Sequence, residues 1–209
     1  VVLSGIVTAL LSLMTIKNFS KEELNVKKVL IYLSVYTVFL IISCFHFSGI
    51  SRLLLNIIIM ITSLYFSLFK KNISDSVYYT IVYNVFAAFF EVLLSLIFVG
   101  LLKFDINVYE NFSFSLLVFS ICNCLSVFFI SKIKPLDKAL QKFNRIISKN
   151  NKDWIYIIIC IILVVLLITF NEYNLKSNVE FYINIFITIF MFISIIYVVY
   201  NKIQKSAYE

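Results

Sequence analysis

The stretch from 77 to 102, VYYTIVYNVFAAFFEVLLSLIFVGLL, decides the fold class of this chain. Its 26 residues form one continuous apolar run that contains a single charged residue, Glu91. A bilayer core of about 30 Å needs roughly 17 to 25 such residues in one helix. The strands of a membrane barrel would need only about 10 residues each, with alternating polar and apolar positions. The stretch therefore predicts a transmembrane helix.

The same pattern recurs along the whole chain of 209 residues, of which 62% are hydrophobic and 14% are charged. Charged and polar clusters divide it into seven apolar runs, at 1–16, 29–45, 53–69, 77–102, 112–131, 154–170 and 181–200. This pattern predicts an all-α, polytopic membrane bundle of about seven transmembrane helices in a single domain, 1–209. The chain begins Val-Val rather than with Met, so we expect it to be a fragment of a longer protein.

The basic residues are divided very unevenly between alternate connections. The odd-numbered connections and the C-terminal tail hold 15 of the 18 Lys and Arg residues, whereas the even-numbered connections hold only Arg52, Lys103 and Lys176. The positive-inside rule therefore places the odd connections and the C-terminus in the cytoplasm, and the N-terminus outside. The net charge of +7 indicates contact with an anionic inner leaflet and does not imply a nucleic-acid partner.

The fifth connection, between the fifth and sixth runs, is predicted to contain an amphipathic helix at 135–149, with Pro135 in its first turn. Apolar residues recur on one face, at Leu136, Leu140, Phe143 and Ile147. Basic residues occupy mostly other positions, at Lys138, Lys142, Arg145 and Lys149. The pattern favours a cytoplasmic helix that lies on the inner leaflet and sets these four basic side chains against anionic lipid. A solvated segment packed on the cytoplasmic helix ends is the alternative.

Glu91 lies near the middle of the run at 77–102, where a charge is costly unless it faces the bundle interior or water. Small and polar residues share its helical face, at Thr80, Asn84, Ala88 and Ser95. The run at 53–69 has a matching stripe, at Asn56, Met60, Ser63 and Ser67. We expect the two stripes to meet and Glu91 to hydrogen-bond to Asn56 or to another interior polar group. Glu91 and Asn84 are candidate ligand-binding residues, and a polar clamp between helices is the alternative role.

The loops predicted to lie outside the cell are short and both acidic and aromatic. Their candidate ligand-binding residues are Asp105, Tyr109, Glu110, Glu172 and Tyr173. Such loops suit contact with a small peptide, and they equally suit ordinary hydration at the headgroup boundary. With three Gly and one His, the chain lacks a Gly-rich phosphate loop and a His cluster, so we expect no catalytic site, cofactor or metal in it.

The layout resembles the N-terminal sensor region of Agr-type peptide-pheromone sensor histidine kinases of low-GC Gram-positive bacteria. The shared features are six or seven Ile- and Phe-rich helices, short outside loops, basic inside loops, and a last helix at 181–200 that leads into the tail NKIQKSAYE at 201–209. The resemblance implies a multi-pass quorum-sensing receptor in the cell membrane. It would bind an extracellular peptide as a homodimer and signal through the last helix to a cytoplasmic kinase domain, absent from this chain, and onward to a response regulator.

Two other functions stay open. A small transporter or permease subunit would use Glu91 as an intramembrane coupling carboxylate. An Agr-type membrane peptidase that matures the pheromone would need a His and a Cys close together on the cytoplasmic side. The pattern favours the peptidase less, because His46 is predicted to lie outside and the next cysteine after it is Cys122.

Overall fold

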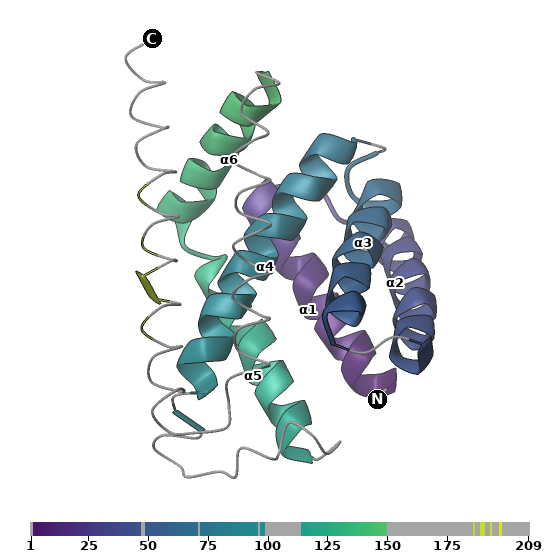
Figure 1. Ribbon diagram of the computed structural model, residues 1–209. Coiled ribbons are helices and arrows are strands. Elements are labelled where there is room, and N and C mark those ends of the chain that lie inside the picture. The colour runs from purple at the N-terminus through teal and green to yellow at the C-terminus, as the bar shows by residue number, and fades with distance from the viewer. Residues whose placement is uncertain are drawn as a thin grey trace.

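The computed structural model describes residues 2–46, 49–70, 72–95, 97–98 and 114–149, together with the five positions 186, 189, 190, 193 and 197. Its elements are α1 (Val2–Ser20), α2 (Val26–His46), α3 (Gly49–Ser67), α4 (Ile73–Ser95), α5 (Phe114–Ile130) and α6 (Lys134–Lys149) (Figure 1). No strand occurs in these ranges, which confirms the all-α prediction. The first five helices correspond to the first five apolar runs, and α6 corresponds to the predicted amphipathic helix.

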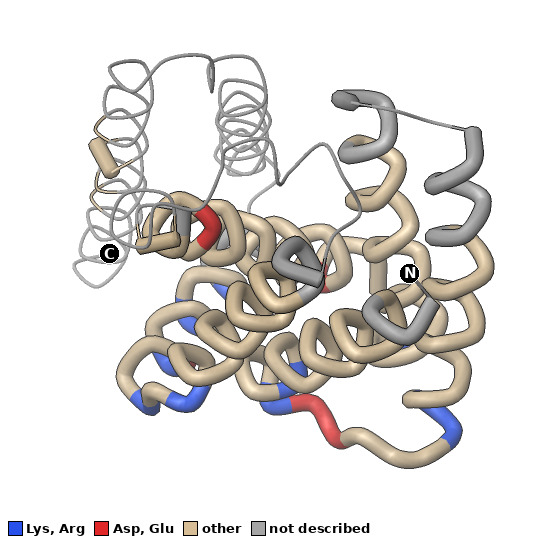
Figure 2. Tube along the Cα trace, turned by 90° about the horizontal axis from the view of Figure 1, so that it is seen from below, with Lys and Arg blue, Asp and Glu red and all other residues tan. Residues whose placement is uncertain are grey.

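Helix α1 lies at the centre of this bundle, in contact with α2, α4, α5 and α6. Helix α3 packs between α2 and α4. Successive helices from α1 to α5 run in opposite directions, so the α1–α2 turn, the α3–α4 turn and α6 lie at one end (Figure 1). Lys and Arg residues gather on one side, on α6 and on the α1–α2 turn (Figure 2). We call this the basic end of the bundle.

Local capping, rather than hydropathy, sets several helix boundaries. The Oδ1 atom of Asn25 accepts a hydrogen bond from the backbone N–H of Lys28 at 2.9 Å, which caps α2. Asn72 caps α4 in the same way, by accepting from the N–H of Asp75 at 3.3 Å. As a result α2 and α4 begin before the predicted positions 29 and 77. Helix α1 runs to Ser20, past the predicted end at 16, and then stops at Lys21, whose φ is 60°.

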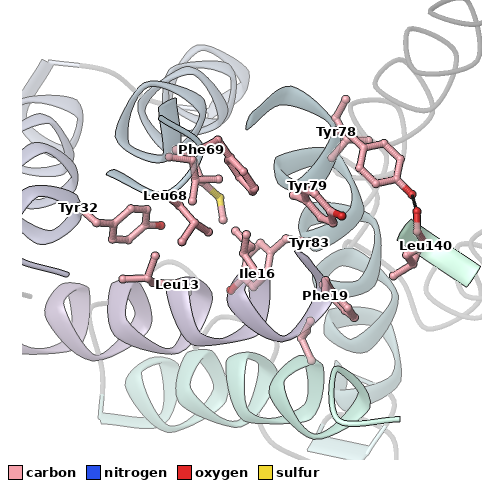
Figure 3. Packing of buried hydrophobic residues seen from close by; sticks show 14 of the residues in the cluster. Leu13, Ile16, Phe19, Tyr32, Leu68, Phe69, Tyr78, Tyr79, Tyr83 and Leu140 are labelled. Carbon is pink, nitrogen blue, oxygen red and sulfur yellow. Dashed lines mark hydrogen bonds between the residues drawn. The ribbon is translucent and has the colours of Figure 1, made fainter. Parts of the chain in front are cut away.

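Aromatic rings and aliphatic side chains fill the core near the basic end (Figure 3). Phe69 stacks on Tyr79 with ring centroids 5.3 Å apart, and Phe19 stacks on Phe86 at 5.7 Å. Leu13, Ile16, Leu64 and Leu68 are buried in the same cluster. These contacts fix α1, α3 and α4 at the end where α6 docks.

Small polar side chains are also buried inside the bundle, at Ser12, Thr15, Ser63, Ser67, Ser76 and Thr80. Each of these hydroxyls donates to a carbonyl three or four residues back in the chain, at 2.6 to 2.8 Å. Their hydrogen-bonding capacity is thus met locally, and their small size lets the helix backbones approach closely. These six hydroxyl groups are therefore buried without an unsatisfied donor.

Large apolar side chains, in contrast, cover the outside of the bundle. They include Met14, Leu30, Val38, Phe39, Leu54, Ile58, Phe66 and Phe129, all exposed. In the run at 181–200, Phe186, Phe190, Ile193 and Tyr197 are exposed and follow the i, i+4, i+7, i+11 spacing of one helical face. Large contiguous apolar patches are rare on water-soluble monomers.

The described helices yield one or two candidate membrane spans by length and composition. Ile73–Leu94 qualifies by itself, and the pair Val118–Ile130 and Lys134–Arg145 qualifies only if the two helices, bent by 84°, count as one span. Gly5–Ser20 and Leu54–Ser67 are shorter apolar helices. The predicted span at 154–170 lies outside the described residues. The count of seven therefore stays a prediction.

Candidate functional site at the α6 junction

Helix α6 is turned sharply away from α5 and docks on the ends of α1 and α4. The turn consists of Ser131, Lys132 and Ile133, and the carbonyl of Ile133 accepts from the N–H groups of Leu136 and Asp137 at 3.0 and 3.3 Å. Pro135 lies in the first turn of α6, where its missing N–H costs no helical hydrogen bond. The resulting 84° bend sets α6 nearly perpendicular to α5.

The apolar face of α6 is covered by the bundle. Leu140 and Phe143 are buried, and Leu136 packs partly buried against the same core. The hydroxyl of Tyr78, itself buried on α4, donates to the carbonyl of Leu140 at 2.9 Å (Figure 3). The Tyr78 and Phe143 rings lie 6.2 Å apart. The alternative interpretation, a segment packed on the helix ends, therefore describes this face better than insertion into lipid does.

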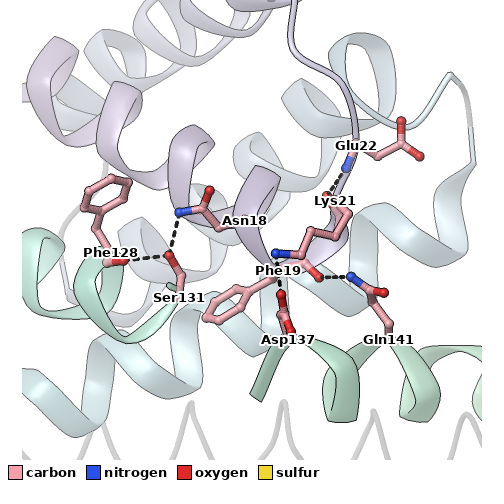
Figure 4. A network of polar contacts seen from close by, with 9 residues as sticks. Asn18, Phe19, Lys21, Glu22, Phe128, Ser131, Asp137 and Gln141 are labelled. Atoms are coloured by element: carbon pink, nitrogen blue, oxygen red, sulfur yellow. Dashed lines mark hydrogen bonds and ion pairs between the residues drawn. The ribbon is translucent and has the colours of Figure 1, made fainter. Parts of the chain in front are cut away.

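Polar side chains of α6 complete the junction with α1 (Figure 4). The Asp137 carboxylate pairs with the ammonium of Lys21, directly after α1. The Nε2 group of Gln141 donates to the carbonyl of Phe19 at 3.1 Å, so it satisfies one of the carbonyls left free at the end of α1. Nearby, the Nδ2 group of Asn18 donates to the Ser131 hydroxyl at 2.9 Å. Three contacts thus join the end of α1 to α6 and the turn before it.

A second polar group ties α6 to α4. The Nδ2 group of Asn144 donates to Oδ1 of Asp75 at 2.7 Å, while the other oxygen of Asp75 accepts from Asn72 at 2.8 Å. Asp75 lies in the first turn of α4, where a carboxylate also interacts favourably with the helix dipole. The residue that caps α4 is therefore part of the same network that holds α6.

Burial is asymmetric in the ion pair between Lys21 and Asp137. The Asp137 side chain is 4% exposed, whereas that of Lys21 is 57% exposed. The hydrogen bond from Lys21 lowers the pKa of the Asp137 carboxyl, against the opposing effect of burial. Asp137 therefore stays ionised at neutral pH and depends on a cation that water can reach.

The structure brings together part of the predicted intramembrane stripe. Asn84 donates through Nδ2 to the carbonyl of Thr80 at 2.8 Å and lies 3.9 Å from the sulfur of Met60 on α3. The polar stripe of α4 and the polar stripe of α3 thus meet at Asn84 and Met60. Glu91 is half-buried on the same helix, α4. The bond from Glu91 to Asn56 stays a prediction.

The remaining predicted residues fall into two groups. Lys138, Lys142 and Arg145 are exposed on α6, and Lys149 lies at the end of that helix with its side chain outside the described part. The predicted outside-loop residues, Asp105, Tyr109, Glu110, Glu172 and Tyr173, lie outside the described residues altogether.

Sequence reasoning missed the polar residues that hold α6 in place: Asp75, Asp137, Gln141 and Asn144, together with the role of Lys21 as a partner. A signal for three of them was present, because Asp137, Gln141 and Asn144 follow the i, i+4, i+7 spacing of one helical face. That face adjoins the apolar one, which indicates a partner that is itself partly polar.

The junction holds α6 by apolar contacts, side-chain hydrogen bonds and one ion pair. Among the described residues, no group of three or more His, Cys, Asp or Glu side chains could hold a metal ion. Comparison of the chain with protein-family models, with curated proteins and with solved structures finds no match.

Proposed function

We propose that this chain is the membrane-embedded sensor module of a signalling protein. It spans the membrane about seven times, with the basic end in the cytoplasm and the N-terminus outside. It binds an extracellular peptide at the opposite end and passes the change through the helix at 181–200 to a cytoplasmic histidine kinase domain. The observation that carries this proposal is the α6 junction, where one amphipathic helix joins the ends of the two apolar helices α1 and α4.

Support for a membrane location comes from the distribution of polarity. Apolar side chains cover the outside, small hydroxyl residues lie between the helices, and basic residues gather at one end. The apolar helix Ile73–Leu94 contains 22 residues. At 1.5 Å per residue it is about 33 Å long, which is sufficient for a bilayer core of about 30 Å.

Support for signalling comes from the two sides of the junction. Gln141 and Asp137 hold α6 to the end of α1, whereas Asn144 and Leu140 hold it to the start of α4. A ligand that shifts α1 relative to α4 would favour one set of contacts over the other. A helix with two alternative sets of contacts has two conformations, and a small displacement of α1 or α4 changes the fraction of molecules in each conformation.

The reading frame beyond Glu209 and a chimaera test the proposal together. A frame that continues into a kinase domain supports sensing, and a stop codon directly after Glu209 contradicts it. In the chimaera, a histidine kinase catalytic domain is joined after Glu209, and autophosphorylation in membrane vesicles is measured with and without peptides from the host's culture medium. We expect a peptide-dependent change, and a rate that no peptide fraction alters would overturn the proposal.

Transport is the second candidate, because the half-buried Glu91 lies in the apolar helix α4, four residues before its end at Ser95. Its test uses proteoliposomes that contain a trapped pH dye and carry an imposed potassium diffusion potential. Proton uptake that requires Glu91 and disappears in Glu91→Gln would favour a transporter. Equal dye responses in wild-type, Glu91→Gln and protein-free vesicles would favour the sensor.

A further inference from the structure

Helix α6 has a purely basic face on the side opposite its buried residues Leu140 and Phe143. At 100° per residue, its five basic residues fall within about 80° of arc. They are Lys134, Lys138, Lys142, Arg145 and Lys149, and the first four have exposed side chains. The acidic residue of this helix, Asp137, is buried on another side against Lys21. The charge of the exposed face is therefore not offset within α6.

The described apolar residues of α6, Leu136, Leu140 and Phe143, are not available for insertion into a membrane. Leu140 and Phe143 are buried against α1 and α4, and the Tyr78 hydroxyl holds the Leu140 carbonyl. A partner that binds the exposed basic face of α6 must therefore be recognised through the negative charge of the partner. The chemistry that fits is a surface of closely spaced anions.

The position of α6 along the bundle indicates which anionic surface this is. The helix contacts Phe19 and Lys21 at the end of α1, and Asp75 and Tyr78 in the first turns of α4. These residues mark the ends of the apolar helices, where lipid headgroups form a layer of about 5 to 8 Å. The 84° bend sets α6 nearly perpendicular to α5, so in a membrane that α5 crosses α6 would lie along this level.

Exposed apolar side chains adjoin the basic face at the α5–α6 turn. Phe129 is 63% exposed and Ile133 is 47% exposed. Lys132 extends its ammonium to 4.6 Å from the centroid of the Phe128 ring and 5.7 Å from that of Phe129. At the boundary between acyl chains and headgroups, apolar side chains contact the acyl chains and neighbouring lysines extend their ammonium groups toward the headgroups. The α5–α6 turn has this combination of residues.

From these observations we propose that the outward face of α6 is a binding site for anionic phospholipid headgroups of the cytoplasmic leaflet, recognised by charge without insertion of the helix. This inference rests on the membrane location proposed above. It assigns α6 two opposite partners, the bundle on one face and the lipid on the other. Lipid charge would thereby stabilise the docked position of α6.

The test uses the full chain, purified in an uncharged detergent and immobilised, and measures retention of radiolabelled phosphatidylglycerol or phosphatidylcholine. The variant Lys138→Gln/Lys142→Gln/Arg145→Gln removes three charges, each worth about fivefold in affinity, so we expect about a hundredfold weaker binding of phosphatidylglycerol. The matched control, Lys138→Arg/Lys142→Arg, keeps the charge and should bind as the wild type does. Circular dichroism checks that both variants retain their helices.

Equal binding of phosphatidylglycerol by the Gln and Arg variants would overturn the inference. Two measurements on the wild type test it independently of any variant: phosphatidylglycerol should bind more tightly than phosphatidylcholine, and added salt should weaken that preference. Tighter binding of polyglutamate or of an oligonucleotide than of phosphatidylglycerol would also overturn it, because either result assigns the face to a soluble partner.

Alkaline carbonate extraction of cell membranes separates this inference from the proposed function. A chain that carbonate releases would contradict the membrane location itself. A chain that stays in the membrane fraction but shows no preference for phosphatidylglycerol would contradict the headgroup site alone.

Discussion

Replacing the two partners of the Lys21–Asp137 ion pair one at a time should have unequal effects on the docking of α6. Lys21→Met leaves a carboxylate that is 4% exposed without its cation, and breaking a buried pair in this way is strongly destabilising. Asp137→Asn releases an ammonium that is already 57% exposed and can be hydrated. We expect costs of about 2 kcal/mol for Lys21→Met and about 1 kcal/mol for Asp137→Asn.

Hydrogen–deuterium exchange of the peptide that covers 134–149, in the full chain in detergent, measures this docking directly. The two costs correspond to about thirtyfold and about fivefold faster exchange of the protected amides. The double variant Lys21→Met/Asp137→Asn should exchange more slowly than Lys21→Met, because no charge is then left buried. If Asp137→Asn opened α6 as much as Lys21→Met, or if the double variant were the most open of the three, the reasoning from burial would be refuted.

Three further outcomes are expected. Tyr78→Phe removes the hydroxyl that donates to Leu140 and should destabilise the docking of α6 by about 1 kcal/mol, seen as about fivefold faster exchange of α6 with little change at α2. Lys70 is exposed and has a φ of 48°, a left-handed conformation that glycine adopts at lower cost, so Lys70→Gly should raise the Tm by about 2 °C. The control Lys132→Gly changes a residue without a positive φ and should lower the Tm. The pKa of the Asp137 carboxyl is lower in the folded chain than in the unfolded chain, where it is about 3.9. The stability that Asp137 contributes is therefore fully present above about pH 3.9 and is lost as the pH falls through the pKa of the folded chain. After correction for intrinsic exchange rates, the amides of α6 should exchange faster in acid in the wild type but not in Asp137→Asn.

Much of the architecture could be predicted from hydropathy and periodicity. The apolar runs predicted five of the described helices, and the spacing of Leu136, Leu140 and Phe143 predicted α6. The boundaries were less accurate, because they depend on the caps at Asn25 and Asn72 and on left-handed residues at Lys21 and Lys70. A hydropathy pattern does not register these local hydrogen bonds.

The candidate site was harder to predict for a different reason. Amphipathicity shows that a helix has an apolar face and does not show what covers it, since lipid and a protein core are equally apolar. Only the tertiary structure decided that Leu140 and Phe143 face α1 and α4. The same placement gave Asp137 and Asn144 their partners, Lys21 and Asp75, which lie far away in the sequence.

The sequence by itself determined the fold class, the places of its helices and the uneven distribution of its charge, because each of these follows from local composition and a 3.6-residue period. The tertiary structure decided which side of α6 is covered, which carboxylate is buried and which cation compensates it. Those properties depend on contacts between segments that lie far apart in the sequence, by 62 residues for Tyr78 and Leu140 and by more than a hundred for Lys21 and Asp137. No local pattern specifies such contacts, because many pairings of helix faces satisfy the same periodicity.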